Sequence, residues 1–435
     1  AYDISACLVG SEMCIRDSIF DLETQLFPCL IDMKFRGVCV DVERAHKLKR
    51  ELSQQEEALL SEVKKQTGID VQIWAARSIA KVFDSLSLSY ARTEKTNSPS
   101  FTKNFLSTHQ HPMVKNIAKA REINKAHTTF IDTILKHQYR GRIHADINPI
   151  RSDQGGTVTG RFSYSNPNLQ QIPARNKDLG PMIRSLFIPE KDHKWGCFDY
   201  SQQEPRLVVH YAATTEPICF DNSVSSIVDK FKDNSGDFHQ TVADMANISR
   251  TQAKTINLGL FYGMGKAKLQ AELGLNTKDE AEDLFNQYHQ NVPFVRDLMN
   301  YTSKTAQTSG SIGTLLGRRC RFNKWEPAQF GMHKPMEYEE AERTYGRGRI
   351  RRAFTYKALN KLIQGSAADM TKKAMVDLYS EGVIPHIQIH DELDISVESD
   401  DAAKKIIDIM ENAVTLEVPN KVDYESGKTW GDIYD

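Results

Sequence analysis

The sequence predicts an α+β fold in which a large helical insertion interrupts one antiparallel sheet. The short apolar run WGCFDY, which contains Asp199, predicts a strand. Apolar and polar residues alternate on both sides of residues 390–392, and this pattern predicts a β-hairpin with a charged tip. Residues 237–300, between these segments, have strong helical periodicity. The elements therefore follow the order helical lobe, sheet, helical lobe, sheet.

The N-terminal segment divides into two parts. Residues 21–66 have a helical pattern with a turn at Arg36 and Gly37. Residues 1–18 have neither the basic start of a secretory signal nor the amphipathic repeat of a helix. We interpret residues 1–18 as an atypical N-terminal extension or a sequence-assembly scar, with an ordinary extension as the alternative.

The composition limits the class of protein. The chain has 435 residues, enough for several domains, with 40% hydrophobic and 26% charged residues, which is typical of globular proteins. No apolar run approaches the roughly 18 residues that a membrane span needs, so no transmembrane segment is expected. The formal net charge is -1, so a nucleic-acid partner has to be argued from local basic patches.

Acidic residues lie at the ends of the predicted strands. Asp199 ends one strand, and Asp391 and Glu392 lie at the tip of the hairpin. Carboxylates at strand ends can converge on one side of a sheet, where they suit Mg²⁺, which prefers a few carboxylates plus substrate phosphates and water. Two such ions about 3.5–4 Å apart can activate an attacking hydroxyl and stabilise a leaving oxygen. A solvated turn is the alternative for an isolated HDE triplet.

A second candidate site lies on the predicted helix over 250–265. Arg250, Lys254, Leu258 and Tyr262 recur every four residues, so they share a face about 120° wide and span about 18 Å. The cations lie at the N-terminal end, where the helix dipole favours phosphates, and the apolar residues lie where a sugar and base would follow. His239 is a further candidate for a side chain that donates a hydrogen bond to a phosphate. The alternatives are an ordinary amphipathic helix and a structural histidine.

Five segments of the chain resemble, in order, the motifs of the family A (DNA polymerase I-like) DNA polymerases. Three of them resemble polymerase motifs A, B and C, and two resemble the TGR-x-S…PNLQ-x-IP and N-x3-QG-x-AAD segments of that family. These segments are DYSQQEPRL (199–207), RTQAKTINLGLFYGMG (250–265), IHDEL (389–393), TVTGRFSYSNPNLQQIPAR (157–175) and NKLIQGSAAD (360–369).

The resemblance implies a right-hand polymerase fold with a thumb, a palm that holds the antiparallel sheet, and helical fingers. It places the thumb at 19–140, the palm at 141–206 and 350–435, and the fingers at 207–349. It implies a DNA-directed DNA polymerase that uses primer-template DNA and dNTPs. We expect a cytoplasmic monomer, in the bacterial host cytoplasm if a phage encodes it, with separate proofreading or processivity factors as further partners.

The resemblance also implies roles for individual residues. Asp199 and Asp391 would hold two Mg²⁺ ions, or Mn²⁺ in their place, with Glu392 in support. Arg250 and Lys254 would contact the triphosphate, Lys254 would also donate a proton to pyrophosphate, and His239 would be a further phosphate ligand. Leu258 would lie near the sugar and Tyr262 over the nascent pair. Glu204 with Tyr262 would exclude a 2′-OH, and Gln202 would line the region of the minor-groove contacts near the primer end. The implied DNA contacts are Arg161, Asn360 and Gln364 in the minor groove and His390 on the primer strand.

The chain departs from the family pattern at several positions, among them Gln203 and Pro205, which replace apolar residues common in motif A. Leu258 stands where the family usually has Phe or Tyr, and we hypothesise weaker packing against the incoming sugar. Tyr356 stands where many relatives have Arg. These differences favour a phage branch over a bacterial repair enzyme.

The segment FDLET (20–24) resembles the first motif of a 3′–5′ exonuclease, but the further acidic motifs of such a domain are missing. We therefore expect Asp21 and Glu23 to form the polar start of a helix. Two alternatives to a DNA polymerase stay open at this point. They are a single-subunit RNA polymerase and a non-catalytic DNA-binding polymerase relic.

Overall fold

The structure is a computed structural model, and it describes most of the chain. The backbone is described for residues 2–150, 156–173, 176–233, 236–261, 266–275, 277–329, 331 and 333–433. Side chains are described from residue 19 onward within these ranges, except at positions 258, 260, 261, 266 and 267.

The centre of the molecule is a four-stranded antiparallel sheet in the order β13-β14-β8-β15. Its strands are β8 (Lys194–Tyr200), β13 (Ile387–Ile389), β14 (Glu392–Val397) and β15 (Val422–Gly427). β8 therefore pairs with strands that lie about 200 residues or more further along the chain, and the predicted interruption of one sheet by a helical insertion is confirmed. The predicted hairpin around residues 390–392 is also confirmed, because β13 pairs with β14.

The sheet is anchored by large buried side chains and by helices that pack on it. Trp195 and Phe198 on β8 are fully buried, and the Trp195 ring stacks on Trp430 at 5.8 Å between centroids. The hydroxyl of Tyr200 donates to the carbonyl of Met410 at 2.6 Å. α17 (Asp400–Asn412) contacts β14 and β15, and α16 (Ala358–Ser380) packs against both α17 and α8 (Gln203–Thr214). This packing fixes the end of β8, where Asp199 lies.

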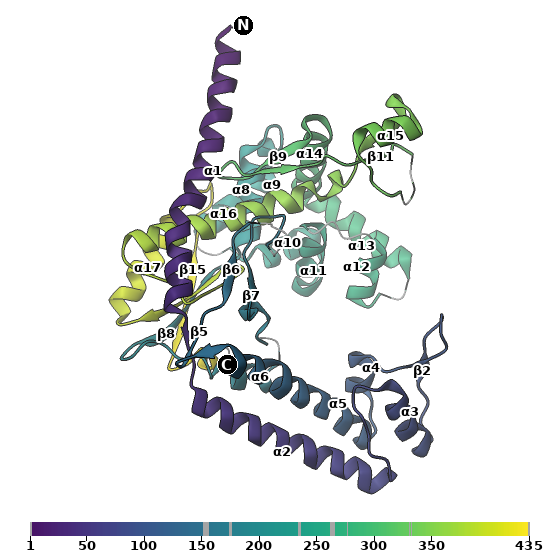
Figure 1. Ribbon diagram of the computed structural model, residues 1–435. Coiled ribbons are helices and arrows are strands. Elements are labelled where there is room, and N and C mark those ends of the chain that lie inside the picture. Colours follow the sequence, from purple (N-terminus) through teal and green to yellow (C-terminus); the bar gives the residue numbers. More distant parts are fainter. Residues whose placement is uncertain are drawn as a thin grey trace.

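A helical arm extends from one side of the sheet (Figure 1). Its long helix, α2 (Val42–Thr67), packs along α5 (Pro112–Lys125). α2 begins where the carboxylate of Asp41 accepts from the amide of Arg44 at 2.9 Å, and it ends at Gly68, whose φ of 74° favours glycine. The far end of the arm has its own hydrophobic cluster, formed with α3 (Ala76–Ser85) and α4 (Lys103–Thr108).

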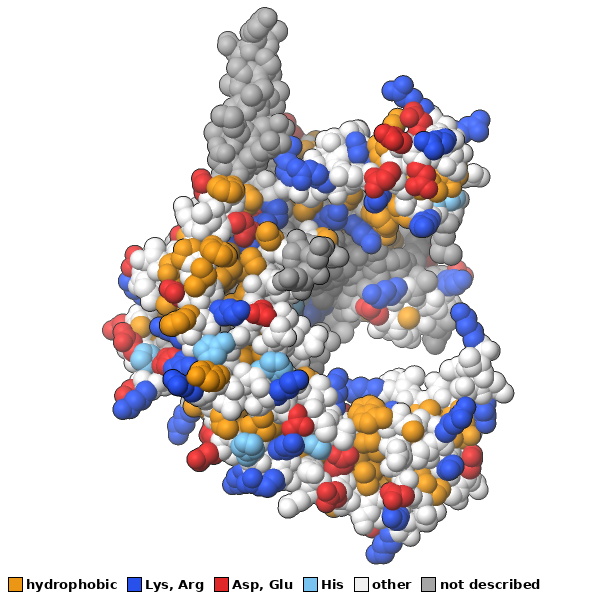
Figure 2. All heavy atoms as spheres, viewed as in Figure 1, with side chains coloured by type: hydrophobic (Ala, Val, Ile, Leu, Met, Phe, Trp, Pro, Cys, Tyr) orange, Lys and Arg blue, Asp and Glu red, His pale blue; other side chains and the backbone are white. Residues whose placement is uncertain are grey.

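A second helical lobe lies opposite this arm, and an opening between the two is visible in the ribbon and in the space-filling view (Figures 1 and 2). The predicted helicity of residues 237–300 is confirmed there. The helices of this lobe are α9 (Asn222–Lys232), α10 (Phe238–Ala246), α11 (Arg250–Phe261), α12 (Lys266–Leu273), α13 (Lys278–Asn291) and α14 (Pro293–Ser309).

Short elements complete the fold. Small antiparallel pairings join β1 (Val38–Cys39), β4 (Gln138–Tyr139) and β5 (Arg142–Ile143); β2 (Ala91–Arg92) and β3 (Pro99–Ser100); β6 (Asp146–Asn148) and β7 (Ser163–Ser165); β9 (Ser311–Gly313) and β10 (Arg319–Arg321); and β11 (Trp325–Pro327) and β12 (Ile350–Arg352). The remaining α-helices are α6 (Asp132–His137), α7 (Leu179–Arg184) and α15 (Tyr338–Tyr345).

The N-terminal helix corrects one of the expectations from the sequence. α1 runs from Tyr2 to Arg36 as one helix, although residues 2–18 lack the amphipathic repeat of a helix. Asp21 and Glu23 consequently lie inside α1 and do not form its polar start. Residues 2–18 contain no proline and several good helix formers, so a helix can continue through them without an amphipathic pattern. Among the described residues, no helix combines the length and apolar character of a membrane span.

Candidate active site

The acidic residues predicted at the strand ends meet at one edge of the central sheet. Glu392, the first residue of β14, lies directly opposite Asp199 on β8, and Asp423 on β15 lies opposite Asp199 on its other side. Asp391 forms the turn before β14, and its carbonyl accepts from the amide of Tyr200 at 3.2 Å. The structure therefore brings Asp199, Asp391 and Glu392 together although almost 200 residues separate the first from the others.

Within this acidic cluster the ionisation of Asp199 and of Asp391 is unfavourable. Burial, followed by the charges of Asp391 and Glu392, raises the pKa of Asp199 to about 8. Burial also raises the pKa of Asp391 to about 6, against the opposing charge of Arg161. Groups of like charge that cannot all ionise in one place are stabilised when a cation binds among them. The carboxylate oxygens of Asp199 and Asp391 thus fit a hard divalent cation.

Glu392 lies in a second, deeper group of side chains. Single ligand atoms of Cys197, Glu392 and Asp394 lie within 4.8 Å of one another. Asp394 is fully buried, and one of its carboxylate oxygens accepts from the indole of Trp195 at 2.8 Å. Burial and the neighbouring charge of Glu392 raise the pKa of Asp394 well above its ordinary value, and Asp394 and Glu392 share a hydrogen bond. A protonated Asp394 that hydrogen-bonds Glu392 accounts for this arrangement without an ion.

Arg161 joins the residues expected in the minor groove to the acidic cluster. Its guanidinium forms an ion pair with Glu204 at 2.6 Å, and both side chains are largely buried. Burial lowers the pKa of His390 and the charge of Arg161 lowers it further, while the same charge opposes the rise that burial causes in the pKa of Asp391. Arg161 therefore lies beside the turn of the HDE hairpin. His390 is exposed at this turn, with a φ of 57°, and lines a groove of about 540 Å³ that Lys125 of α5 also borders.

Gln202 has a structural task in the described molecule. It precedes α8, and its amide nitrogen donates to the carbonyl of Gly236 at 3.2 Å while its amide oxygen accepts from the amide of Phe238 at 2.9 Å. These bonds tie the end of β8 to the start of α10. The side-chain amide of Gln202 is therefore already hydrogen-bonded through both its nitrogen and its oxygen. Any contact of Gln202 near the nucleotide would have to form with these two bonds in place.

The predicted cationic face of α11 is present at its N-terminal end. Arg250 is the first residue of α11 and pairs with Asp237 at 2.7 Å, while Lys254 is exposed one turn later. His239 is buried, and its Nδ1 lies 3.1 Å from the amide nitrogen of Asn257 on α11. Burial, with a smaller effect of Lys254 and Arg250, lowers the pKa of His239 to about 4. His239 is therefore neutral at pH 7 and can act on an anion only as a hydrogen-bond donor.

Of four other predicted site residues, the structure describes the side chains of two. Asn360 and Gln364 are half-buried on α16, one turn apart on the same face, as predicted. Tyr262 lies outside the described residues, and Leu258 lies on α11 with a side chain outside them.

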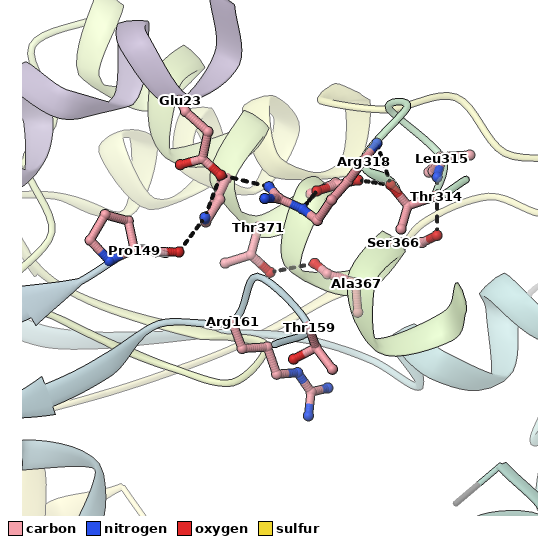
Figure 3. A network of polar contacts seen from close by, with 12 residues as sticks. Glu23, Pro149, Thr159, Arg161, Thr314, Leu315, Arg318, Ser366, Ala367 and Thr371 are labelled. Carbon is pink, nitrogen blue, oxygen red and sulfur yellow. Dashed lines mark hydrogen bonds and ion pairs between the residues drawn. The ribbon is translucent and has the colours of Figure 1, made fainter. Parts of the chain in front are cut away.

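An ionic network that was not predicted from the sequence holds this region together (Figure 3). Glu23 of α1 accepts from Arg318 and from Lys372, each at 2.6 Å. Arg318 also pairs with the buried Asp369 at 2.8 Å, and Lys372 donates to the carbonyl of Pro149 at 2.9 Å. The network joins α1, α16, the loop between β9 and β10, and the segment that leads to Arg161.

Two glycines let these elements approach closely. Gly160 has a φ of 85°, and a Cβ there would lie 2.7 Å from Nε of Arg318. A Cβ at Gly365 on α16 would lie 2.6 Å from the methyl group of Thr314, whose hydroxyl donates to Asp369. The charge pairs at Glu23 and Asp369 could be suspected only from the unusual Lys and Asp inside an apolar stretch of α16.

Comparisons with known proteins agree with this arrangement. The model of the family described as DNA polymerase family A matches residues 42–432. A DNA-directed DNA polymerase of Pseudomonas phage M6 is 33% identical, over 95% of this chain and 66% of that protein. DNA polymerase I of Geobacillus stearothermophilus is 32% identical, over 95% of this chain and 46% of that protein. The chain therefore spans between about half and two thirds of the length of these relatives.

A solved structure has a similar fold. The POL domain of Pol1 from M. smegmatis, in complex with DNA primer-template and dNTP, matches with a TM-score of 0.74 and 25% sequence identity. The match covers 95% of this chain and 70% of the other.

Proposed function

Because the chain belongs to DNA polymerase family A, we propose that it catalyses template-directed DNA synthesis on a primer. In the proposed reaction the primer 3′-OH attacks the α-phosphate of a dNTP, a new phosphodiester bond forms, and pyrophosphate leaves. The observation that carries this proposal is the convergence of Asp199 and Asp391, which lie beside each other at the edge of the sheet.

Polymerases of this family use divalent metal ions. We propose that Asp199 and Asp391 hold two Mg²⁺ ions here, with Mn²⁺ as a substitute. When bound, such ions supply charge neutralisation at the attacking and leaving oxygens. The raised pKa values of both aspartates support the assignment, because the cluster is poorly neutralised by the side chains around it.

The chain's own cations complete the proposed site. Lys254 is exposed on α11, from where it can reach a triphosphate, and we assign it the protonation of the leaving pyrophosphate. Arg250 would exchange its surface contact with Asp237 for a phosphate oxygen. The neutral His239 would donate a hydrogen bond to the same group. Most of the rate enhancement then comes from positioning and from fixed charges.

The remaining residues are proposed to test the sugar of the nucleotide and the shape of the base pair at the primer end. Glu204 stands beside the cluster and would exclude a ribose 2′-OH together with Tyr262, which favours DNA over RNA synthesis. Arg161, Asn360 and Gln364 would contact the minor-groove edges of the primer end, whose acceptors are similar for all correct pairs. Such contacts test the shape of a pair without reading its sequence.

The domain assignment follows the same proposal. The helical arm of α2–α5 serves as the thumb, the sheet with α16 as the palm, and the lobe of α9–α14 as the fingers. Primer-template DNA would occupy the opening between arm and lobe (Figure 2). We assign the protein, as a monomer, to the cytoplasm of a bacterial host, in line with the phage relatives.

Primer extension tests the proposal. Wild-type protein should extend a labelled primer in the presence of Mg²⁺ and dNTPs, and should use rNTPs poorly. Asp391→Ala should lose at least about a thousandfold in rate, in the range that removal of a central catalytic group produces. Lys191→Ala, in the exposed loop before β8, is the control and should extend normally. Undiminished extension by Asp391→Ala would contradict the proposed role.

A further inference from the structure

A basic pocket lies outside the carboxylate site, between the β9–β10 hairpin and α16. Its volume is about 550 Å³. Four cations line it, and no acidic side chain of the described residues does. The lining residues that matter here are Gly160, Arg318, Arg319, Arg321 and Lys361.

The strand pattern explains how two arginines reach this pocket. Cys320 at the centre of β10 is buried, so Arg319 and Arg321 on either side of it point to the opposite face. Arg321 is exposed, and it forms no ion pair with an acidic side chain in the described ranges. The hairpin therefore presents cations to the pocket by simple alternation.

Lys361 enters the same pocket from α16. Its ammonium donates to the carbonyl of Arg321 at 3.3 Å and lies 4.2 Å from the centre of the Phe322 ring. None of the described carboxylates pairs with it. Burial lowers the pKa of Lys361, which agrees with an ammonium group that has few compensating charges.

Arg318 forms a fixed wall of the pocket. Its guanidinium is held by Glu23 and Asp369 and packs against Gly160, so its charge is already neutralised (Figure 3). The ionic network thereby fixes the hairpin to α16. The cations of Arg321 and Lys361 are thus presented on a rigid support and not on a free loop.

We infer that this pocket binds a backbone phosphate of the DNA duplex, a contact that rests on the proposed function. Lys361 directly follows Asn360 on α16 and lies about 60° around the helix from Gln364. A duplex whose minor groove meets Asn360 and Gln364 therefore brings a phosphodiester within reach of the pocket. Lys and Arg are the usual partners of such phosphates, and the contact fixes register without reading sequence.

Equilibrium binding of primer-template DNA at several salt concentrations, without nucleotide, tests the inference. Arg321→Gln and Lys361→Gln should each weaken binding at low salt. Combined, they should reduce the slope of log Kd against log salt by about 1 for each phosphate that the protein no longer neutralises. Lys191→Gln, in the exposed loop at the far end of β8 from Asp199, is the matched control and should keep the wild-type slope.

Charge-conserving variants separate a binding defect from a folding defect. Arg321→Lys and Lys361→Arg should restore most of the affinity and the salt slope. An unchanged slope and Kd in the double Gln variant would overturn the inference. Failure of the proposed function would be seen differently, as absence of primer extension by the wild-type protein.

Duplexes with neutral methylphosphonate linkages identify the strand. If the template supplies the phosphate, neutral linkages in the template should abolish the difference between wild type and the double Gln variant, while neutral linkages in the primer should leave it. The opposite result assigns the phosphate to the primer. A difference that survives neutral linkages in both strands would overturn the inference.

Discussion

Arg161 and Glu204 form a largely buried ion pair at 2.6 Å, although 43 residues separate them in sequence. The pair connects a residue expected at the minor groove with one expected at the sugar of the nucleotide. The charge of Arg161 also opposes the rise that burial causes in the pKa of Asp391, so the pair stands beside the proposed metal site. With the proposed roles of these two residues, this contact would couple the check on the pair at the primer end to the check on the sugar.

A double-mutant cycle tests this coupling. Arg161→Met and Glu204→Gln should each lower kcat/KM for a correct dNTP, because each removes one side of the ion pair. Together they should cost less than the sum, with a coupling of about 0.5–3 kcal/mol. Arg142→Met with Glu190→Gln removes another partly buried pair, at 2.7 Å, and should leave incorporation unchanged. Additive effects of the Arg161 and Glu204 changes would contradict the coupling.

The raised pKa of Asp199 predicts how the metal-free protein depends on pH. The folded pKa of about 8 lies above the ordinary value of 3.8, so the folded state holds a proton that the unfolded chain releases. Stability should therefore fall as pH rises from about 4 to 8, by about 1.4 kcal/mol for each pH unit within that range. Urea unfolding in EDTA at several pH values measures this.

Asp199→Asn removes the titrating group and should flatten that dependence. The variant should be more stable than the wild type at pH 8 in EDTA, and the two should converge near pH 4. Mg²⁺ should raise the stability of the wild type more than that of the variant. Parallel curves of stability against pH for the two proteins would show that titration of Asp199 does not cause the pH dependence.

The network around Glu23 predicts a specific loss of stability. Lys372 is fully buried between Glu23 and the carbonyl of Pro149. Lys372→Met leaves a largely buried carboxylate without one of its partners and should cost about 3 kcal/mol in unfolding free energy. Lys373→Met, at the next position, removes a half-exposed pair with Asp377 and should cost less than about 1 kcal/mol. Equal losses in chemical denaturation would argue against a structural role for the network.

Much of the fold and part of the site followed from the sequence. Strand alternation around Asp391 and periodicity over residues 237–300 are local signals, and the structure contains both predicted elements. The contacts of Glu23 with Arg318 and Lys372 span 295 and 349 residues and leave no periodic trace, so the pairing of these residues could not be predicted.

Three other features show the limits of prediction from the sequence alone. Gln202 matched a motif, but its amide is used to join β8 to α10. The nearness of Cys197, Glu392 and Asp394 follows from strand register, which the sequence left unassigned. The helix over residues 2–18 lacks the amphipathic pattern on which helix prediction depends.

Anomalous diffraction from crystals grown with Mn²⁺, primer-template DNA and a non-hydrolysable dNTP analogue is the decisive test of the metal site. We expect two Mn²⁺ peaks beside the carboxylates of Asp199 and Asp391, and loss of the peaks in Asp391→Asn. Peaks confined to the group of Cys197, Glu392 and Asp394, or absent from Asp199, would contradict this expectation.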